Sequence, residues 1–112
     1  MIGTNVEIDK KQIAALFQTG YRAFEQGRYE EATKILTGLL VLDGANPFVY
    51  EILGTIYSRG DRPEVALACF DRAIELVPTE AFYLVSKAEI LLKLGRVEEA
   101  AQDLKAAIHQ DQ

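Results

Sequence analysis

The sequence is poor in the residues on which most active sites and covalent cross-links depend. It has one cysteine, Cys69, and one histidine, His109. No internal disulfide can form, and neither residue has the sequence neighbours of a zinc site or an activated thiol. Glycine-rich phosphate loops, a serine nucleophile elbow and metal-binding helix motifs are also missing. We therefore expect a protein that is not an enzyme, with no metal and no cofactor.

Positive charge and long apolar runs are also scarce. The net charge is −5 at pH 7, and a phosphate backbone is normally bound by clustered Lys and Arg, so no nucleic-acid partner is expected. Apolar runs such as residues 39–42 are short, whereas a membrane span needs roughly 20 residues. The first dozen residues lack the basic start and apolar run of a secretory signal. We expect no membrane span and a cytoplasmic location.

Two carboxylate pairs, Glu30-Glu31 and Glu98-Glu99, are the remaining candidates for acid–base chemistry. Each pair falls in the first turn of a predicted helix, where the helix dipole favours negative charge. His109 falls near the end of the last predicted helix, where a cation is mildly favoured. All are expected to be solvated structural residues.

The sequence does contain an internal repeat, in which positions correspond at a constant offset of 34 without gaps. Small residues recur in register, and larger apolar residues, predicted to be core, follow the same period. The matching sets are Gly20, Gly54 and Ala88; Ala32, Ala66 and Ala100; Leu39, Ala73 and Ala107; Leu16, Tyr50 and Leu84; and Leu36, Phe70 and Leu104. Two helices approach closely only where one presents little side chain, so the small positions indicate helix hairpins.

Turn signals divide each repeat into two helices. Gly27, Gly60 and Gly95 are each expected to take the left-handed conformation that ends a helix. Pro47, after Asn46, and Pro63 are each expected in a first helical turn. The spacing predicts no strand and helices over about 10–26, 29–42, 47–59, 63–76, 81–94 and 97–110. The three units would be 13–46, 47–80 and 81–112, forming one continuous domain over 10–112 after a polar, partly mobile lead of residues 1–12.

Residues 47–80 match a known repeat at all of its characteristic positions, which are Tyr50, Leu53, Gly54, Tyr57, Ala66, Phe70, Ala73 and Pro78. They resemble the tetratricopeptide repeat (TPR). The resemblance implies an all-α fold, an α-α superhelix (solenoid) of three helix hairpins, whose concave side is lined by the first helix of each pair. The other two units depart in places, and Lys87 occupies a usually apolar site.

The concave positions are the expected peptide-binding residues. They are Phe17, Tyr21, Phe24, Phe48, Thr55, Ser58, Phe82, Val85, Glu89 and Leu92, with Ala14, Glu25, Glu51, Arg59 and Lys93 on the same faces. The alternative is that the aromatic side chains belong to the core, as stripes at helical spacing usually do. Leu16, Gly20 and Ala23 already meet the core's needs in the first unit, which favours exposure. A clamp for a C-terminal carboxylate is disfavoured, because Phe17 and Tyr21 stand where such TPR proteins have Lys and Asn.

A narrower resemblance involves residues 15–43 (ALFQTGYRAFEQGRYEEATKILTGLLVLD), Leu53-Gly54 and residues 87–100 (KAEILLKLGRVEEA). These segments resemble the class II type III secretion chaperones. The resemblance implies a bacterial, cytoplasmic chaperone that holds an extended, proline-containing segment of a secreted translocator in its concave groove. Phe17, Tyr21 and Phe24 match aromatic groove positions of that family. A structural TPR adaptor in a multiprotein assembly is the alternative.

The last predicted helix carries an apolar strip that the third pair leaves uncovered. Ala101, Leu104 and Ile108 are expected to face outward there. An uncovered strip of this kind predicts a homo-oligomer or a partner that completes the stack.

Overall fold

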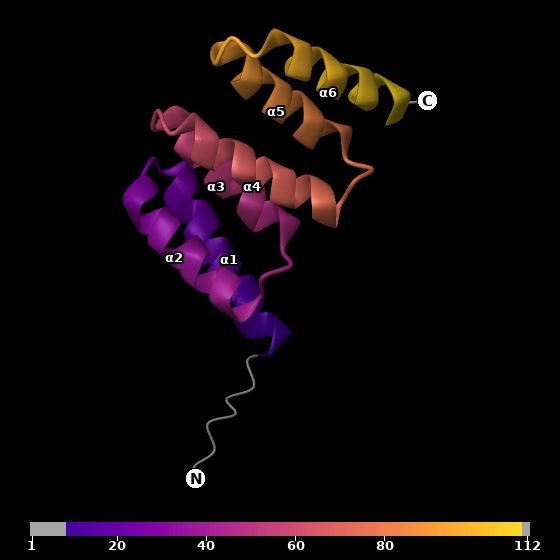
Figure 1. Ribbon diagram of the computed structural model, residues 1–112. Helices are drawn as coiled ribbons and strands as arrows, with labels where there is room; N and C mark the ends of the chain where they lie inside the picture. The colour runs from indigo at the N-terminus through magenta and orange to yellow at the C-terminus, as the bar shows by residue number, and fades with distance from the viewer. Residues whose placement is uncertain (1–8, 111–112) are drawn as a thin grey trace. The chain divides into compact units, whose positions relative to one another are not determined.

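A computed structural model describes residues 9–110, which are all-helical (Figure 1). The helices in this part of the chain are α1 (Lys10–Glu25), α2 (Tyr29–Leu42), α3 (Pro47–Arg59), α4 (Pro63–Leu76), α5 (Ala81–Lys93) and α6 (Val97–Gln110). The predicted helices are confirmed, with α1 and α5 each ending one residue earlier than expected. Between residues 9 and 110 there is no strand. The predicted mobile lead falls mostly on residues 1–8, which lie outside the described residues, as do residues 111–112.

Side chains just before the helices explain where several of them begin. Asp9 and Gln12 form a reciprocal capping box, in which the Gln12 N–H donates to Asp9 Oδ1 at 2.8 Å and the Asp9 N–H donates to Gln12 Oε1 at 3.0 Å. Asn46 Oδ1 accepts a hydrogen bond from the Phe48 N–H at 3.0 Å. Proline stands in the first turn of α3 and of α4, as predicted. The last residues assigned to the polar lead are therefore the start of α1.

The turns inside the hairpins correct one prediction. Gly27 and Gly95 have positive φ angles of 76° and 77°, as expected. Gly60 does not, with a φ of −86°, and Asp61 takes the left-handed conformation instead, with a φ of 61°. Positions 27, 61 and 95 correspond at the same offset as the helices. The left-handed conformation therefore occurs at a fixed position of the repeat, whether or not that position holds glycine. Aspartate tolerates this conformation better than most residues with a side chain.

The described residues form two compact units, one ending at residue 44 and the other beginning at residue 45; they are called unit 1 and unit 2. In unit 1 (described from residue 9), α1 packs on α2 in an antiparallel hairpin (Figure 1). A Cβ atom added to Gly20 would lie 2.7 Å from Leu36 Cδ2, so glycine is what permits this close approach. Leu16, predicted to be core, is 39% exposed. That prediction was wrong, because α2 alone packs on α1 among the described residues of this unit and does not cover Leu16.

In unit 2, α3 packs on α4, α4 on α5 and α5 on α6 (Figure 1). The buried cluster takes its members from α4, α5 and α6, among them Phe70 (3% exposed) and Leu91 (0%), and half-buried tyrosines of α3 pack against it. Leu84 is buried and Tyr50 is half-buried, in agreement with the core prediction. Leu104, the matching position of α6, is 36% exposed and is not a core residue. The proposal that both units form one continuous domain remains a prediction.

Candidate functional site

An aromatic row lies along α1 in unit 1. Phe17 and Tyr21 are stacked with ring centroids 6.1 Å apart, and the Tyr21 and Phe24 centroids are 6.2 Å apart. The row continues to Tyr29, the first residue of α2, whose ring is 5.8 Å from that of Phe24. We call these four residues the aromatic row. Sequence reasoning identified the first three, while Tyr29 was missed because it begins the following helix.

The aromatic row is neither fully buried nor fully exposed. Tyr21 is 37% exposed, and Phe17, Phe24 and Tyr29 are half-buried. The buried face of α1 is formed by Gly20 and Ala23, which are the contact positions towards α2. The row therefore lies beside the hairpin core and presents part of its ring surface outside that core, an arrangement that aromatic side chains in binding sites commonly adopt.

A polar cleft opens between α3 and α5 in unit 2, with a volume of about 230 Å³. Its lining is mainly polar and comes from these two helices and one residue of α4: Thr55, Ser58, Arg59, Phe70, Ser86, Glu89, Ile90 and Lys93. The cleft brings together three of the predicted site residues, Thr55, Ser58 and Glu89. Ser86 was missed, although it lies on the same helix face as Phe82 and Glu89, four residues after one and three before the other.

The cleft carries both signs of charge. Arg59 and Lys93 stand in the last turns of α3 and α5, and Glu89 lies one turn before Lys93. The Thr55 hydroxyl donates to the Glu51 carbonyl at 3.0 Å. Such a cleft can offer hydrogen bonds and charges to a polar ligand.

A hydrogen bond between the Glu51 side chain and the Tyr83 hydroxyl links α3 to α5. Burial raises the pKa of Glu51, the hydrogen bond with the Tyr83 hydroxyl opposes this, and Glu80 adds to the rise. Burial, together with the charges of Glu51 and Glu80, raises the pKa of Tyr83 to about 12. The tyrosine therefore remains a hydrogen-bond donor at physiological pH.

The other predicted binding residues of unit 2 lie outside the cleft. Phe48 is 58% exposed, Phe82 is 54% exposed and Leu92 is 49% exposed, whereas Val85 is half-buried. Phe48 and Phe82 occupy the first turns of α3 and α5. Exposed aromatic residues therefore lie at the N-terminal ends of α3 and α5, and charged residues lie at their C-terminal ends.

The acidic pairs are where the sequence placed them, in the first turns of α2 and α6, and all four side chains are exposed. Within them, Glu31 pairs with Arg28, Glu30 with Lys34, and Glu99 with Arg96. His109 lies in the last turn of α6. On the same helix, Ala101, Leu104 and Ile108 are exposed as expected.

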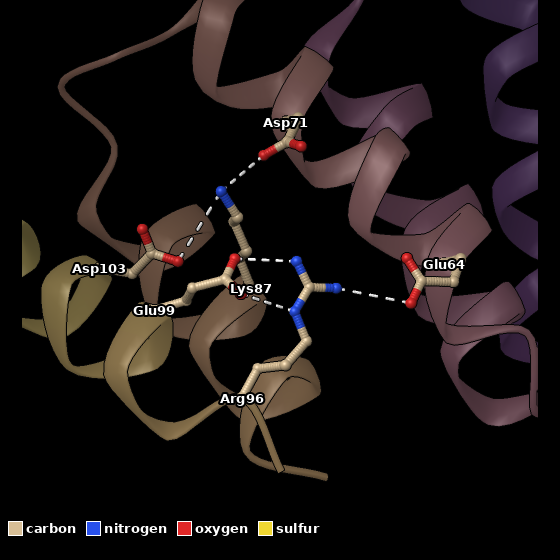
Figure 2. A network of polar contacts seen from close by, with 6 residues as sticks. All are labelled: Glu64, Asp71, Lys87, Arg96, Glu99 and Asp103. Atoms are coloured by element: carbon tan, nitrogen blue, oxygen red, sulfur yellow. Dashed lines mark hydrogen bonds and ion pairs between the residues drawn. The ribbon is translucent and has the colours of Figure 1, made fainter. Parts of the chain in front are cut away.

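An ion-pair network that the sequence did not predict joins α4, α5 and α6 (Figure 2). Lys87 Nζ on α5 lies 2.9 Å from Asp71 Oδ1 on α4 and 3.8 Å from Asp103 Oδ2 on α6. Arg96 binds Glu99 through two contacts of 2.8 Å and reaches Glu64 at 3.5 Å. The lysine at a usually apolar repeat position is thus explained by acidic partners on both neighbouring helices.

Within this network the pKa values of Asp103 and Lys87 are both raised, but for different reasons. Burial raises the pKa of Asp103, and Lys87 only partly opposes the rise. Burial by itself would lower the pKa of Lys87, but its hydrogen bond and charge interaction with Asp71, together with Asp103 and Glu99, leave it raised. Lys87 is therefore firmly paired with Asp71. Asp103 remains a poorly compensated carboxylate, whose buried Oδ2 accepts no hydrogen bond from any described residue.

Cys69 is half-buried in α4, and burial raises the pKa of its thiol to about 11. Since only the thiolate reacts, we expect native Cys69 to be alkylated by iodoacetamide roughly a hundredfold more slowly than an exposed cysteine at about pH 8. Mass spectrometry of timed samples, with the denatured chain as the control, measures this. Equal rates in the native and denatured chain would contradict the assigned burial.

Across residues 9–110, no group of His, Cys, Asp and Glu side chains could hold a metal ion. None of the helices described there combines the length and the apolar character needed to cross a bilayer.

Comparison with known proteins identifies the repeat family to which these helix pairs belong. The family model of the tetratricopeptide repeat matches residues 53–112. The Protein STIP1 homolog of Dictyostelium discoideum is 32% identical over 92 residues, which make up 82% of this chain and 16% of that protein. Curated relatives are much longer proteins, of which the chain spans only 4% to 16%.

Two solved structures show the same architecture. The type III secretion chaperone SycD of Yersinia enterocolitica, in complex with a peptide of the translocator YopD, has a TM-score of 0.87 at 24% identity, over 94% of this chain and 80% of that one. The first TPR of Spaghetti (RPAP3), bound to the HSP90 peptide SRMEEVD, has a TM-score of 0.83 at 23% identity, over 95% and 84%. The chain belongs to the tetratricopeptide repeat family, as the register of its internal repeat indicated.

Proposed function

We propose that the chain is a non-catalytic peptide-binding TPR module, and more narrowly a bacterial cytoplasmic chaperone that holds an extended segment of a type III secretion translocator. The observation that carries the proposal is the aromatic row, a continuous series of rings beside the core of unit 1. Similarity of fold to the SycD–YopD peptide complex supports the narrower form.

The aromatic row suits the side chains of an extended segment. Rings at adjacent turns, with centroids about 6 Å apart, would offer a continuous apolar surface to the side chains of such a segment. Successive side chains on one side of an extended strand are about 7 Å apart, a similar spacing. Tyr21, the central and most exposed of Phe17, Tyr21 and Phe24, is the expected anchor.

The cleft between α3 and α5 suits the backbone and polar side chains of the ligand. An extended segment carries N–H and C=O groups that are not paired within itself. Hydroxyl groups of Ser58 and Ser86 and the charges of Arg59, Glu89 and Lys93 supply both donors and acceptors. The contacts offered by this cleft would therefore be mainly polar.

The test is a binding titration with two fluorescein-labelled probes, the YopD peptide and SRMEEVD. We expect the wild-type chain to bind the YopD peptide, and Tyr21→Ala to weaken binding by about 10- to 100-fold, the usual loss for an aromatic anchor. Helicity and melting temperature should change little, since Tyr21 lies beside the hairpin core. SRMEEVD should bind weakly, because Phe17 and Tyr21 occupy the places of the clamp residues.

Thr19→Ala is the matched control. Thr19 is exposed on the same helix, two residues from Tyr21 and so on the opposite side of it. The Thr19→Ala variant should bind the YopD peptide with the affinity of the wild type. If Tyr21→Ala unfolds unit 1, the row is core; if binding is unchanged, or neither probe binds the wild type, the chaperone proposal fails.

The second candidate function is a structural TPR adaptor that stacks through its last repeat. The exposed residues Leu104 and Ile108 on α6 favour it. An adaptor would bind neither probe but would bind another folded protein through α6, so the titration separates the two functions.

A further inference from the structure

An apolar strip runs along α6 on a side of the helix that the rest of unit 2 does not cover. It consists of Val97 (54% exposed), Ala101 (exposed), Leu104 (36%) and Ile108 (60%). The residues are spaced four, three and four apart, which is the spacing of the seam between two coiled helices. We call these four residues the α6 strip.

The two borders of the α6 strip differ. On one side are Ala100 and Ala107, which are 0% and 5% exposed and belong to the face of α6 that packs in unit 2. On the other side are Glu98 and Lys105, both exposed and seven residues apart. Within residues 9–110 neither of these two side chains makes an ion pair. The strip is thus bordered by an acid near one end and a base near the other.

We propose that the α6 strip pairs with the same strip of a second copy of this chain, antiparallel about a two-fold axis between Ala101 and Leu104. In that register Val97 faces Ile108 of the second copy, and the small Ala101 faces the larger Leu104. Residues 98 and 105 then lie across from each other, so Glu98 of each copy pairs with Lys105 of the other, twice by symmetry.

Charge selects this arrangement over the parallel one. A parallel pairing about a two-fold axis would set the Glu98 and Lys105 border of one helix against the Ala100 and Ala107 border of the other, which is already packed in unit 2 and carries no charge. Only the antiparallel pairing brings Glu98 of one copy against Lys105 of the other. The inference is independent of the peptide-binding proposal, since the aromatic row lies in unit 1.

The dimer should be weak. Four apolar residues per helix form an interface near the lower end of the range for specific complexes, which bury about 1,200 Å² or more in total. The net charge of −5 on each copy adds repulsion that salt screens. We therefore expect a concentration-dependent equilibrium with a dissociation constant of about 10–100 μM at physiological salt.

Sedimentation equilibrium of the full chain over a wide concentration range tests the proposal. The wild type should rise from its monomer mass of 12.5 kDa towards twice that value. Glu98→Lys and Lys105→Glu should each weaken the dimer about tenfold, because each makes both border contacts repulsive. The double variant Glu98→Lys/Lys105→Glu should restore it to within about threefold, since the pairs are re-formed with exchanged signs.

The single variants distinguish the effect of the Glu98–Lys105 pairs on association from the effect of the chain's net charge. Glu98→Lys reduces the negative charge of the chain and would favour association if net repulsion alone mattered. Ile108→Glu, at an exposed position that leaves the core intact, should abolish the dimer. A monomer at every concentration, a dimer that tolerates Ile108→Glu, or a double variant that stays weak would overturn the proposal. All these variants should bind the YopD probe as the wild type does, whatever that affinity is.

Discussion

Gly54→Val is expected to lower the free energy of unfolding of unit 2 by about 2–3 kcal/mol, the upper part of the range of about 1–3 kcal/mol that is typical of an overpacked core. A Cβ atom at this position would lie 2.7 Å from Phe70 Cε2 and 2.9 Å from Phe70 Cδ2. Phe70 is 3% exposed and belongs to the main buried cluster, so its packed neighbours resist a shift of its ring. The added side chain must separate α3 from α4.

Gly38→Ala is the matched control with the opposite sign. Gly38 also lies inside a helix, α2, but a Cβ atom there would meet nothing within 4 Å. Alanine should therefore raise the stability by about 0.5–1 kcal/mol through its better helix propensity. The contrast tests whether close approach, rather than helix propensity, explains the glycine in the repeat.

Urea unfolding followed by far-ultraviolet circular dichroism measures both variants, and hydrogen exchange of the α3 amides assigns the Gly54→Val loss to unit 2. Adding Phe70→Leu to Gly54→Val should recover part of the loss, because a smaller side chain opens the contact. If Gly54→Val unfolds at the wild-type urea concentration, the close approach of α3 and α4 described above is wrong.

Most of the fold could be predicted because the helix boundaries depend on local chemistry repeated at a fixed interval. Proline in the first turns of α3 and α4 and the cap at Asn46 mark positions that sequence alone identifies. Gly60 misled the prediction because glycine is the usual left-handed residue, yet the repeat places that conformation at Asp61. Comparing the turns at the same offset as the helices would have found it.

Less of the site could be predicted, because it depends on neighbours from other helices. The spacing on α1 identified Phe17, Tyr21 and Phe24, but Tyr29 joins the row only through the turn into α2. Thr55, Ser58 and Glu89 were expected to bind, while the cleft that gathers them also needs Ser86. Periodicity assigns a residue to a face of its own helix and does not say which residues of the next helix lie opposite.

Lys87 is the clearest case of this limit. By register it occupies an apolar position, and no sequence neighbour accounts for its charge. Its partners Asp71 and Asp103 lie at equal sequence separations before and after it, on the two flanking helices (Figure 2). The symmetric spacing is a consequence of the hairpin repeat, and it can be recognised once the helices are known to pack in chain order.

Lys87→Met is expected to destabilise unit 2 by about 1–3 kcal/mol near pH 7, the range for leaving a largely buried polar group without its partner. Removing the ammonium group leaves the Asp103 side chain, 17% exposed, with no cation near its buried Oδ2. Asp71 should matter less, since its side chain is 51% exposed and water can solvate it. Urea unfolding of both proteins at matched pH measures the loss.

The pH dependence of the Lys87→Met loss identifies Asp103 as its cause. The folded-state pKa of Asp103 is raised, so the stability it contributes is complete below its unfolded pKa of about 4 and is lost as the pH rises through the folded value. Without Lys87 that pKa should rise further, which deepens the loss at neutral pH. The difference between wild type and Lys87→Met should therefore narrow as the pH falls from about 7 to about 4.

The double variant Lys87→Met/Asp103→Leu tests whether Asp103 causes the loss of stability. Replacing both charges by apolar side chains removes the uncompensated carboxylate, and well-packed apolar replacements of buried ion pairs are often neutral or stabilising. We expect the double variant to regain most of the stability lost in Lys87→Met and to lose its extra pH dependence. If the double variant is as unstable as the single one, or the Lys87→Met loss is the same at both pH values, the Asp71 contact and the lysine's own packing carry the effect. Asp103 would then make no stabilising contribution to the contact between α5 and α6.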